Sequence, residues 1–132
     1  MAVADMEDYA RLEIMCRSIL DLDPLMRSAW IINNRGHAVA GGMKSGLKSL
    51  EDTKNDEILF TELALRVRMR HEFDQELGAV HFSMSHREKV IVISFPLADN
   101  WVALASAEHG LNLSRIPFKI LDIVGELRKS TG

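Results

Sequence analysis

The chain has 132 residues, a net charge of −3, 47% hydrophobic and 27% charged residues, which are ordinary values for a globular protein. Its length fits one domain of about 100–200 residues, so we expect a single domain over residues 1–132. The apolar runs are far shorter than the roughly 18 residues of a membrane-spanning helix. Nucleic-acid binding is not expected, because the chain is acidic and its arginines are not interleaved with aromatic residues.

The first residues lack a basic region followed by an apolar stretch, so no secretory signal is predicted and the cytoplasm is the expected compartment. Cys16 is the only cysteine, which excludes an internal disulfide and a zinc site built on cysteine pairs. The five histidines are dispersed over separate predicted elements, so neither a metal nor another cofactor is expected. They are His37, His71, His81, His86 and His109.

Apolar residues recur at three- and four-residue spacing from Met6 to Leu22, which predicts an amphipathic helix. Asp23-Pro24 ends it, because proline disfavours helical geometry in the preceding residue. Ser28–Asn33 and His37–Gly41 are short apolar segments joined by a turn with Gly36, which predicts a β-hairpin.

Gly42 to Asn55 is expected to be a polar loop, and either Thr53 or Asn55 could cap the helix that follows. The glycine-rich stretch from Gly41 to Gly46 superficially resembles a phosphate-binding loop. It lacks the GxxxxGK[ST] spacing and the strand–loop–helix context, so a flexible surface loop is expected instead.

The second half of the chain predicts one long middle helix, three strands and a final helix. The middle helix contains no proline or glycine and should run uninterrupted until a glycine ends it. The last two strands are apolar on both sides, as central strands should be. The predicted ranges are Asp56–Leu77 before Gly78, Ala79–Ser85, Lys89–Phe95, Trp101–Ala107, and a helix capped by Ser114 that runs to about Arg128 with Pro117 in its first turn.

The resulting order, α-β-β-α-β-β-β-α, and the hairpin region from Asp23 to Ala40 resemble the Roadblock (dynein light chain) family over about Met6 to Arg128. The resemblance implies a profilin-like α/β fold of the α+β type. Its five-stranded antiparallel sheet would have the middle helix on one face and the terminal helices on the other. PAS-type sensor domains also have five antiparallel strands, but one uninterrupted helix from Asp56 to Leu77 argues against their several short helices.

Roadblock proteins dimerise through the middle helix and the edge of the third strand, and they act as scaffolds or regulators for small GTPases and motor complexes. The resemblance therefore implies a non-enzymatic homodimeric scaffold, with a small GTPase or another protein as partner. The helix itself has two apolar stripes. We assign the stripe of Phe60, Leu63, Ala64 and Val67 to the sheet, and the other to a partner, because glutamates interrupt it. The expected interface is Ile58, Leu65, Met69, Phe73, Arg66, Arg70, His81 and Ser83.

Two further groups of polar residues have simpler interpretations. The basic cluster of the chain consists of Arg66, Arg68, Arg70 and His71. We interpret it as a solvated helix face with local pairs such as Arg70 with Asp74, or as a contact for an acidic partner. His81, Ser83 and Ser85 share one face of a predicted strand, but no base, orienting acid and oxyanion site accompany them. No catalytic residues are therefore predicted.

The alternative function is a small-molecule sensor domain with a pocket between the sheet and the helices. A scaffold should have a packed interior and an apolar outward helix face, whereas a sensor should enclose a cavity of roughly a few hundred Å³.

Overall fold

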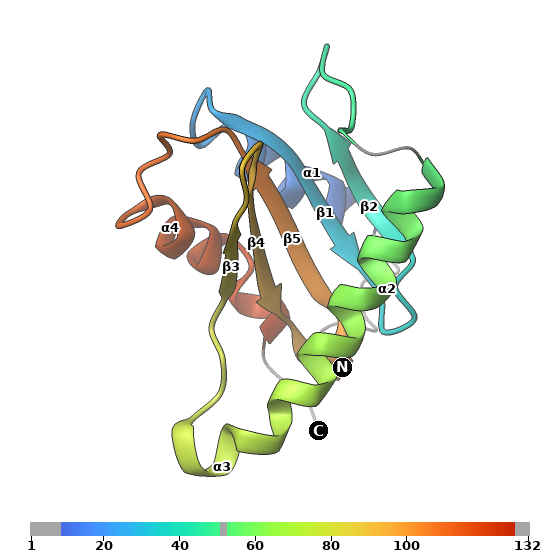
Figure 1. The fold of residues 1–132 in the computed structure, drawn as a ribbon, viewed down its shortest axis with the longest axis vertical. Helices are drawn as coiled ribbons and strands as arrows, with labels where there is room; N and C mark the ends of the chain where they lie inside the picture. Colours follow the sequence, from blue (N-terminus) through green and yellow to red (C-terminus); the bar gives the residue numbers. More distant parts are fainter. Residues whose placement is uncertain (1–8, 51–52, 129–132) are drawn as a thin grey trace.

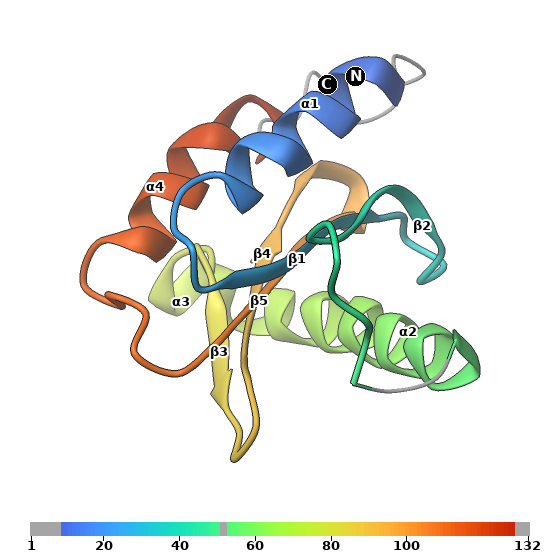
Figure 2. The ribbon, with the colours of Figure 1, turned by 90° about the horizontal axis from the view of Figure 1, so that it is seen from above.

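The computed structural model describes residues 9–50 and 53–128. A five-stranded antiparallel sheet, in the order β2-β1-β5-β4-β3, lies between helices on both faces (Figures 1 and 2). The predicted fold class and order of elements are confirmed. The elements are α1 (Tyr9–Leu20), β1 (Met26–Ile32), β2 (Ala38–Met43), α2 (Thr53–Arg70), α3 (Asp74–Leu77), β3 (Ser83–His86), β4 (Ile91–Pro96), β5 (Val102–Ala107) and α4 (Ile116–Ile123).

Helices cover the two faces of the sheet as predicted: α1 and α4 lie on one, and α2 lies on the other (Figure 2). The larger hydrophobic core lies under α1 and α4 and includes Leu12, Phe95 and Ile120. The smaller core joins α2 to β1 and β5 through Ile32, Phe60, Leu63, Val67, Val102 and Leu104. The stripe assigned to the sheet, including Ala64, is buried, so that assignment is confirmed.

The predicted β1–β2 hairpin is present, and Gly36 has the positive φ of +83° that the turn requires. The N–H of Asn33 donates to the carbonyl of His37 at 2.9 Å. A Cβ on Gly36 would lie 2.6 Å from the Cα of Thr61 in α2, so a side chain here would also push the helix from the hairpin.

The stretch expected to be a loop from Gly42 onward is partly strand, because β2 continues to Met43. Gly41 has φ of +99°, and a Cβ there would lie 2.0 Å from the carbonyl oxygen of Ala29 in β1. Its N–H donates to Oε1 of Glu13 in α1 at 2.9 Å. The glycine therefore permits close strand packing, and the loop prediction is wrong as far as Met43.

The middle helix is not uninterrupted, contrary to the prediction. α2 begins at Thr53 and ends at Arg70, and a 3₁₀ turn, His71–Phe73, separates it from α3. The side chains of Thr53 and Asn55, the two predicted caps, lie outside the described residues. Residues three apart eclipse in a 3₁₀ helix, and His71 Nδ1 contacts Asp74 Oδ2 across this turn at 2.7 Å. Asp74 thus pairs with His71 and not with Arg70 as predicted.

The boundaries of three other elements also differ from the prediction. β3 begins at Ser83, so His81 precedes the strand. Ser114 does not cap α4: its N–H and hydroxyl both donate to Asn112 Oδ1, and Arg115 holds the cap position. Pro117 does lie in the first turn, as predicted. At the N-terminus, α1 ends at Leu20, and the predicted start at Met6 falls outside the described residues.

Candidate interaction surface

The outward face of α2 and α3 carries a row of exposed apolar side chains, which we call the outward stripe. Ile58, Leu65, Met69 and Phe73 are the apolar residues predicted for an interface, and all four are more than half exposed. The structure adds Leu77 of α3, which is 81% exposed. Because the opposite face of α2 already packs on the sheet, nothing among the described residues covers the outward stripe. Figure 1 shows α2 and α3 running diagonally across the sheet and ending beyond β3.

The arginines beside the outward stripe are partly engaged within the chain. Arg66 pairs with Glu62 one turn earlier on the exposed side of α2. Arg68 donates to the carbonyl of Asn34 at 3.2 Å and so ties α2 to the β1–β2 hairpin. Arg66 and Arg68 therefore form local contacts, as predicted for a solvated helix face. The predicted Arg70–Asp74 pair is wrong.

The two edges of the sheet differ. At the β2 edge, the N–H of Gly41 is already bonded to Glu13 of α1. At the other edge β3 pairs with β4, with Ser83 opposite Ser94 and Ser85 opposite Val92. No other strand of the described residues pairs with β3, so its outer side is open to another chain.

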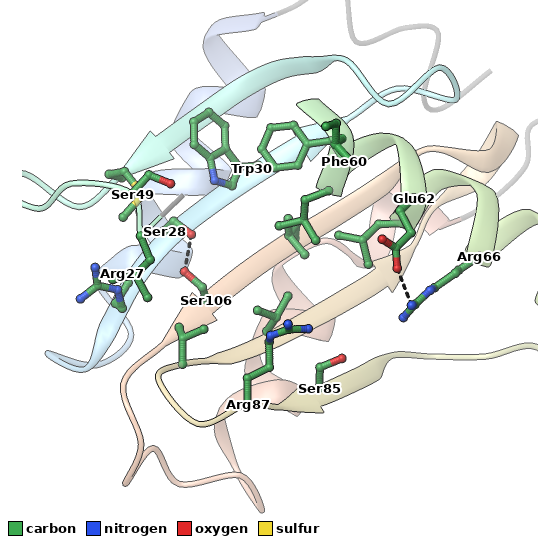
Figure 3. Close-up of a pocket in the computed structure, with 18 residues that line it drawn as sticks. Arg27, Ser28, Trp30, Ser49, Phe60, Glu62, Arg66, Ser85, Arg87 and Ser106 are labelled. Carbon is green, nitrogen blue, oxygen red and sulfur yellow. Dashed lines mark hydrogen bonds and ion pairs between the residues drawn. The ribbon is translucent and has the colours of Figure 1, made fainter. Parts of the chain in front are cut away.

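A groove of about 380 Å³ lies between α2 and the part of the sheet that α2 leaves uncovered (Figure 3). It exists because α2 covers the apolar half of this face, at Ile32 and Val102, while the other half carries Ser28 and Ser106. The groove opens at exposed residues such as Leu50 and Arg87, so it is not a closed cavity. Its walls include Trp30, Phe60, Leu63, Val90, Val92 and Leu104, and its polar lining is Arg27, Ser28, Ser49, Glu62, Arg66, Ser85, Arg87 and Ser106.

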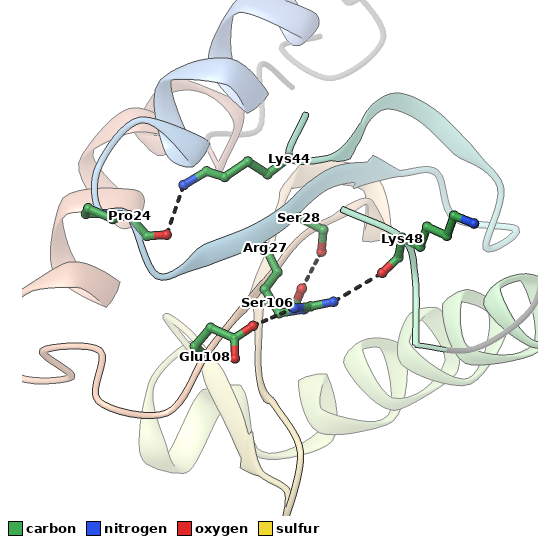
Figure 4. A network of polar contacts seen from close by, with 7 residues as sticks. All are labelled: Pro24, Arg27, Ser28, Lys44, Lys48, Ser106 and Glu108. Atoms are coloured by element: carbon green, nitrogen blue, oxygen red, sulfur yellow. Dashed lines mark hydrogen bonds and ion pairs between the residues drawn. The ribbon is translucent and has the colours of Figure 1, made fainter. Parts of the chain in front are cut away.

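Polar contacts join the segments at one end of the groove (Figure 4). The hydroxyls of Ser28 and Ser106 lie 2.5 Å apart. The guanidinium of Arg27 donates to Glu108 Oε2 at 2.5 Å and to the carbonyl of Lys48 at 3.1 Å, and its side chain is only 13% exposed. Arg27 therefore joins β1, the end of β5 and the loop before α2, and its charge is already paired.

Arg87 is the other arginine at this end of the groove and is exposed on the β3–β4 turn. Its guanidinium has no hydrogen-bond or ion-pair partner among the described residues. The turn itself is fixed, because the N–H of Arg87 donates to the carbonyl of Val90 at 3.0 Å. Nε2 of His109 donates to the carbonyl of Arg87 at 2.6 Å.

The expectation that the histidines are dispersed is wrong for one pair, because His86 and His109 stack with ring centroids 4.7 Å apart. Neighbouring turns bring them together, which the sequence spacing does not reveal. In the part of the chain that the structure describes, no three residues of the metal-binding types (His, Cys, Asp or Glu) form a group that could hold a metal ion.

The residues considered for nucleophilic chemistry do not form a site. Ser83 and Ser85 lie on β3, whereas His81 precedes it. Cys16 is 2% exposed in the core. Burial, and secondarily the charge of Glu13, raises the pKa of its thiol from 9.0 to about 12. This thiol is neutral and inert near pH 7.

The residues that line the groove were missed by sequence reasoning because they come from distant segments. Ser28 and Ser106 are separated by 78 positions, and neither belongs to a recognisable motif. A polar pair at one end of two otherwise apolar neighbouring strands was the available signal, and it required the β1–β5 pairing to be known.

No helix among the described residues is both long enough and apolar enough to cross a bilayer.

Comparison with known proteins identifies the family and the fold of the chain. The model of a family of unknown function, DUF6659, matches residues 4–130. Among curated proteins, none matches this sequence. The gliding protein MglB from Thermus thermophilus has a similar structure, with a TM-score of 0.71 and 11% identity over 91% of this chain and 90% of that chain.

Two other solved structures agree. MglB from Myxococcus xanthus gives a TM-score of 0.70 at 10% identity, covering 91% of this chain and 94% of that chain. A Roadblock/LC7 domain from Streptomyces avermitilis gives 0.67 at 10% identity, covering 88% and 93%. These likenesses show that the chain has the Roadblock/LC7 fold, as the sequence resemblance implied.

Proposed function

The chain belongs to the family of unknown function DUF6659, and we propose that it is a non-catalytic, homodimeric scaffold or regulatory domain. The observation that carries this proposal is the outward stripe of α2 and α3. Singly exposed apolar residues are normal on a protein surface, but a row of them along one helix marks an interaction site. The outer side of β3 supplies a second surface, and the α3 segment leads from the end of α2 to β3 (Figure 1).

The size of the outward stripe indicates that a dimer needs both surfaces. Fully burying a large apolar side chain stabilises by about 1.5–3 kcal/mol, so five side chains that are each at least half exposed offer roughly 1 kcal/mol each. Two copies then gain about 10 kcal/mol, while association costs an estimated 4–15 kcal/mol. We therefore propose that β3 pairs with β3 of the second copy and that the α2 helices meet through Leu65 and Met69. Arg66, Arg70, His81 and Ser83 remain predicted members of this interface.

We propose another protein as the partner of the dimer, with a small GTPase as the first candidate. The support for the GTPase is the resemblance to the Roadblock family, whose members serve such partners. MglB, which shares the fold, is a gliding protein and has been seen in a tetrameric arrangement. Purified small GTPases from the same organism, loaded with GDP or a non-hydrolysable GTP analogue, would test this by calorimetry. Binding by none of them would remove the GTPase from the proposal and leave the dimer.

Analytical ultracentrifugation of the wild type and of Met69→Glu tests the dimer. The side chain of Met69 is 63% exposed in one copy, so the glutamate should leave the monomer folded. Within the interface it would be an unpaired buried carboxylate, which costs several kcal/mol. We expect a micromolar dimer for the wild type and a folded monomer for the variant.

A matched control is Ile14→Glu, which places the same charge on a 60% exposed apolar position of α1, away from the outward stripe. It should leave the dimer intact. A wild-type protein that sediments as a monomer at every concentration would contradict the proposal. A Met69→Glu variant that remains a dimer would place the interface elsewhere.

The groove favours a second candidate function, a small-molecule sensor. Its volume of about 380 Å³ is in the range of ligand pockets, and it lies between the sheet and a helix, but it is an open groove and not the enclosed cavity expected of a sensor. Native mass spectrometry of protein purified under mild conditions separates the candidates. A retained small-molecule mass would support the sensor, whereas a dimer without added mass would support the scaffold.

A further inference from the structure

We infer that the groove of each copy receives the α3 segment, His71–Leu77, of the other copy. This inference rests on the proposed dimer and adds to it a reciprocal, charge-matched insertion beside the α2 helices. It gives both the unpaired guanidinium of Arg87 and the highly exposed Leu77 a partner in the assembled protein.

The topology brings the two regions together. The α3 segment precedes β3 in the chain and lies beyond one end of that strand (Figure 1). The groove lies at the opposite end of β3, where Ser85 and Arg87 form part of its lining. In an antiparallel pair of β3 strands, residues that precede the strand in one copy lie opposite residues that follow it in the other. A two-fold axis through this pair therefore carries each α3 segment toward the groove of its neighbour.

Charge favours this placement. Three arginines and one glutamate line the groove: Arg27, Arg66, Arg87 and Glu62. Arg27 is paired with Glu108 and Arg66 with Glu62, which leaves the guanidinium of Arg87 for a second copy. The α3 segment carries three carboxylates, on Glu72, Asp74 and Glu76, with no lysine or arginine. Asp74 already contacts His71, whereas Glu72 and Glu76 are exposed and have no partner among the described residues. Glu72 and Glu76 are therefore the carboxylates available to Arg87 of the second copy.

The apolar surfaces match as well. Phe73 and Leu77, 57% and 81% exposed, alternate with these carboxylates along the segment. The groove offers the apolar side chains of Val90, Val92 and Leu104 beneath its charged rim. A segment that presents both carboxylates and apolar side chains fits this lining better than a purely apolar helix face, because the guanidinium of Arg87 would otherwise lose water without gaining a partner.

Charge reversal tests the inference. Arg87→Glu, and separately the pair Glu72→Arg with Glu76→Arg, should each raise the dimer dissociation constant at least tenfold in sedimentation equilibrium. Combining all three changes should restore it to within about threefold of the wild type, because the charges are again opposite. Arg35→Glu, on the distant β1–β2 turn, is a control for net charge and should leave the constant unchanged.

Cross-linking gives an independent readout of the contact. Leu77→Cys and Ser85→Cys are prepared as separate proteins, mixed, and oxidised. We expect a Leu77–Ser85 disulfide from the mixture and no disulfide from Leu77→Cys alone, because each Leu77 reaches the groove of the other copy. The β3–β3 pair places the two Ser85 residues near the symmetry axis, so a Ser85–Ser85 disulfide is distinguished from the Leu77–Ser85 disulfide by mass mapping of the linked peptides.

The outcomes separate this inference from the proposed dimer. If Met69→Glu dissociates the protein while Arg87→Glu and the paired glutamate changes do not, the dimer stands and the insertion is wrong. If the wild type is a monomer, both fail. The insertion would also be wrong if the dimer formed no Leu77–Ser85 cross-link and its groove retained a small molecule.

Discussion

Replacing Gly41 by alanine should destabilise the protein strongly, and the structure shows why. The added Cβ would lie 2.0 Å from the carbonyl oxygen of Ala29 and 2.8 Å from the Cα of Trp30. Both atoms belong to the backbone of β1, so no side-chain rotation relieves the contact. β2 must move away from β1 by roughly 1 Å or more, which lengthens the neighbouring hydrogen bonds beyond the roughly 3.2 Å limit of good geometry.

The magnitude follows from two contributions. Holding a non-glycine residue at φ of +99° costs about 1–3 kcal/mol. Weakening two strand-pairing hydrogen bonds costs about 0.5–1.5 kcal/mol each. The sum, about 2–6 kcal/mol, is a large part of a typical stability of 5–15 kcal/mol, and it should lower Tm by roughly 10 °C or more.

Two neighbouring glycines provide controls in the same thermal and urea denaturation experiments. Gly46 has φ of +85° but open space where a Cβ would be added, so Gly46→Ala isolates the cost of the dihedral angle. Gly42 has open space and no positive φ, so Gly42→Ala should be neutral or stabilise by about 0.4–1 kcal/mol. Equal stabilities of the Gly41 and Gly42 variants would refute the close approach of β2 to β1.

Two further predictions concern the β4–β5 turn and the core. Asn100→Gly should raise the free energy of unfolding by up to about 1 kcal/mol in urea denaturation, because Asn100 has φ of +64° and glycine adopts that region without strain; a loss of stability would contradict it. The neutral thiol of Cys16, with its pKa raised from 9.0 to about 12, contributes stability that is complete below pH 9 and is lost between pH 9 and 12. Cys16→Ala should flatten that alkaline slope, and native Cys16 should react with a thiol reagent at pH 8 only after unfolding.

The order of elements could be predicted because each depends on local periodicity. The stripe of Phe60, Leu63 and Val67 recurs at helical spacing, and the sheet buries this stripe. The central strands β4 and β5 are recognisable because they are apolar on both sides, as strands with helices on both faces must be. The outward stripe was identifiable for the same reason: one buried face accounts for only half of the apolar residues in α2.

The features that sequence reasoning missed depend on contacts between distant or competing groups. The break at His71–Phe73 lacks proline and glycine, and it arises where His71 meets Asp74 three residues on. The role of Gly41 became visible only when β2 was seen against Ala29. The groove required knowledge of where α2 ends its coverage of the sheet, which depends on the crossing angle of the helix and not on its composition.

The unequal edges of the sheet set how far an assembly can grow. A sheet with two free edges can add copies at both sides and extend into a fibre. Here Glu13 already occupies the N–H of Gly41 at the β2 edge, so a copy joined through β3 presents at its β2 edge one donor fewer to a third copy. A single carboxylate on α1 thus makes the β2 edge a poorer site for strand addition than the β3 edge, which favours a closed pair over open-ended polymerisation.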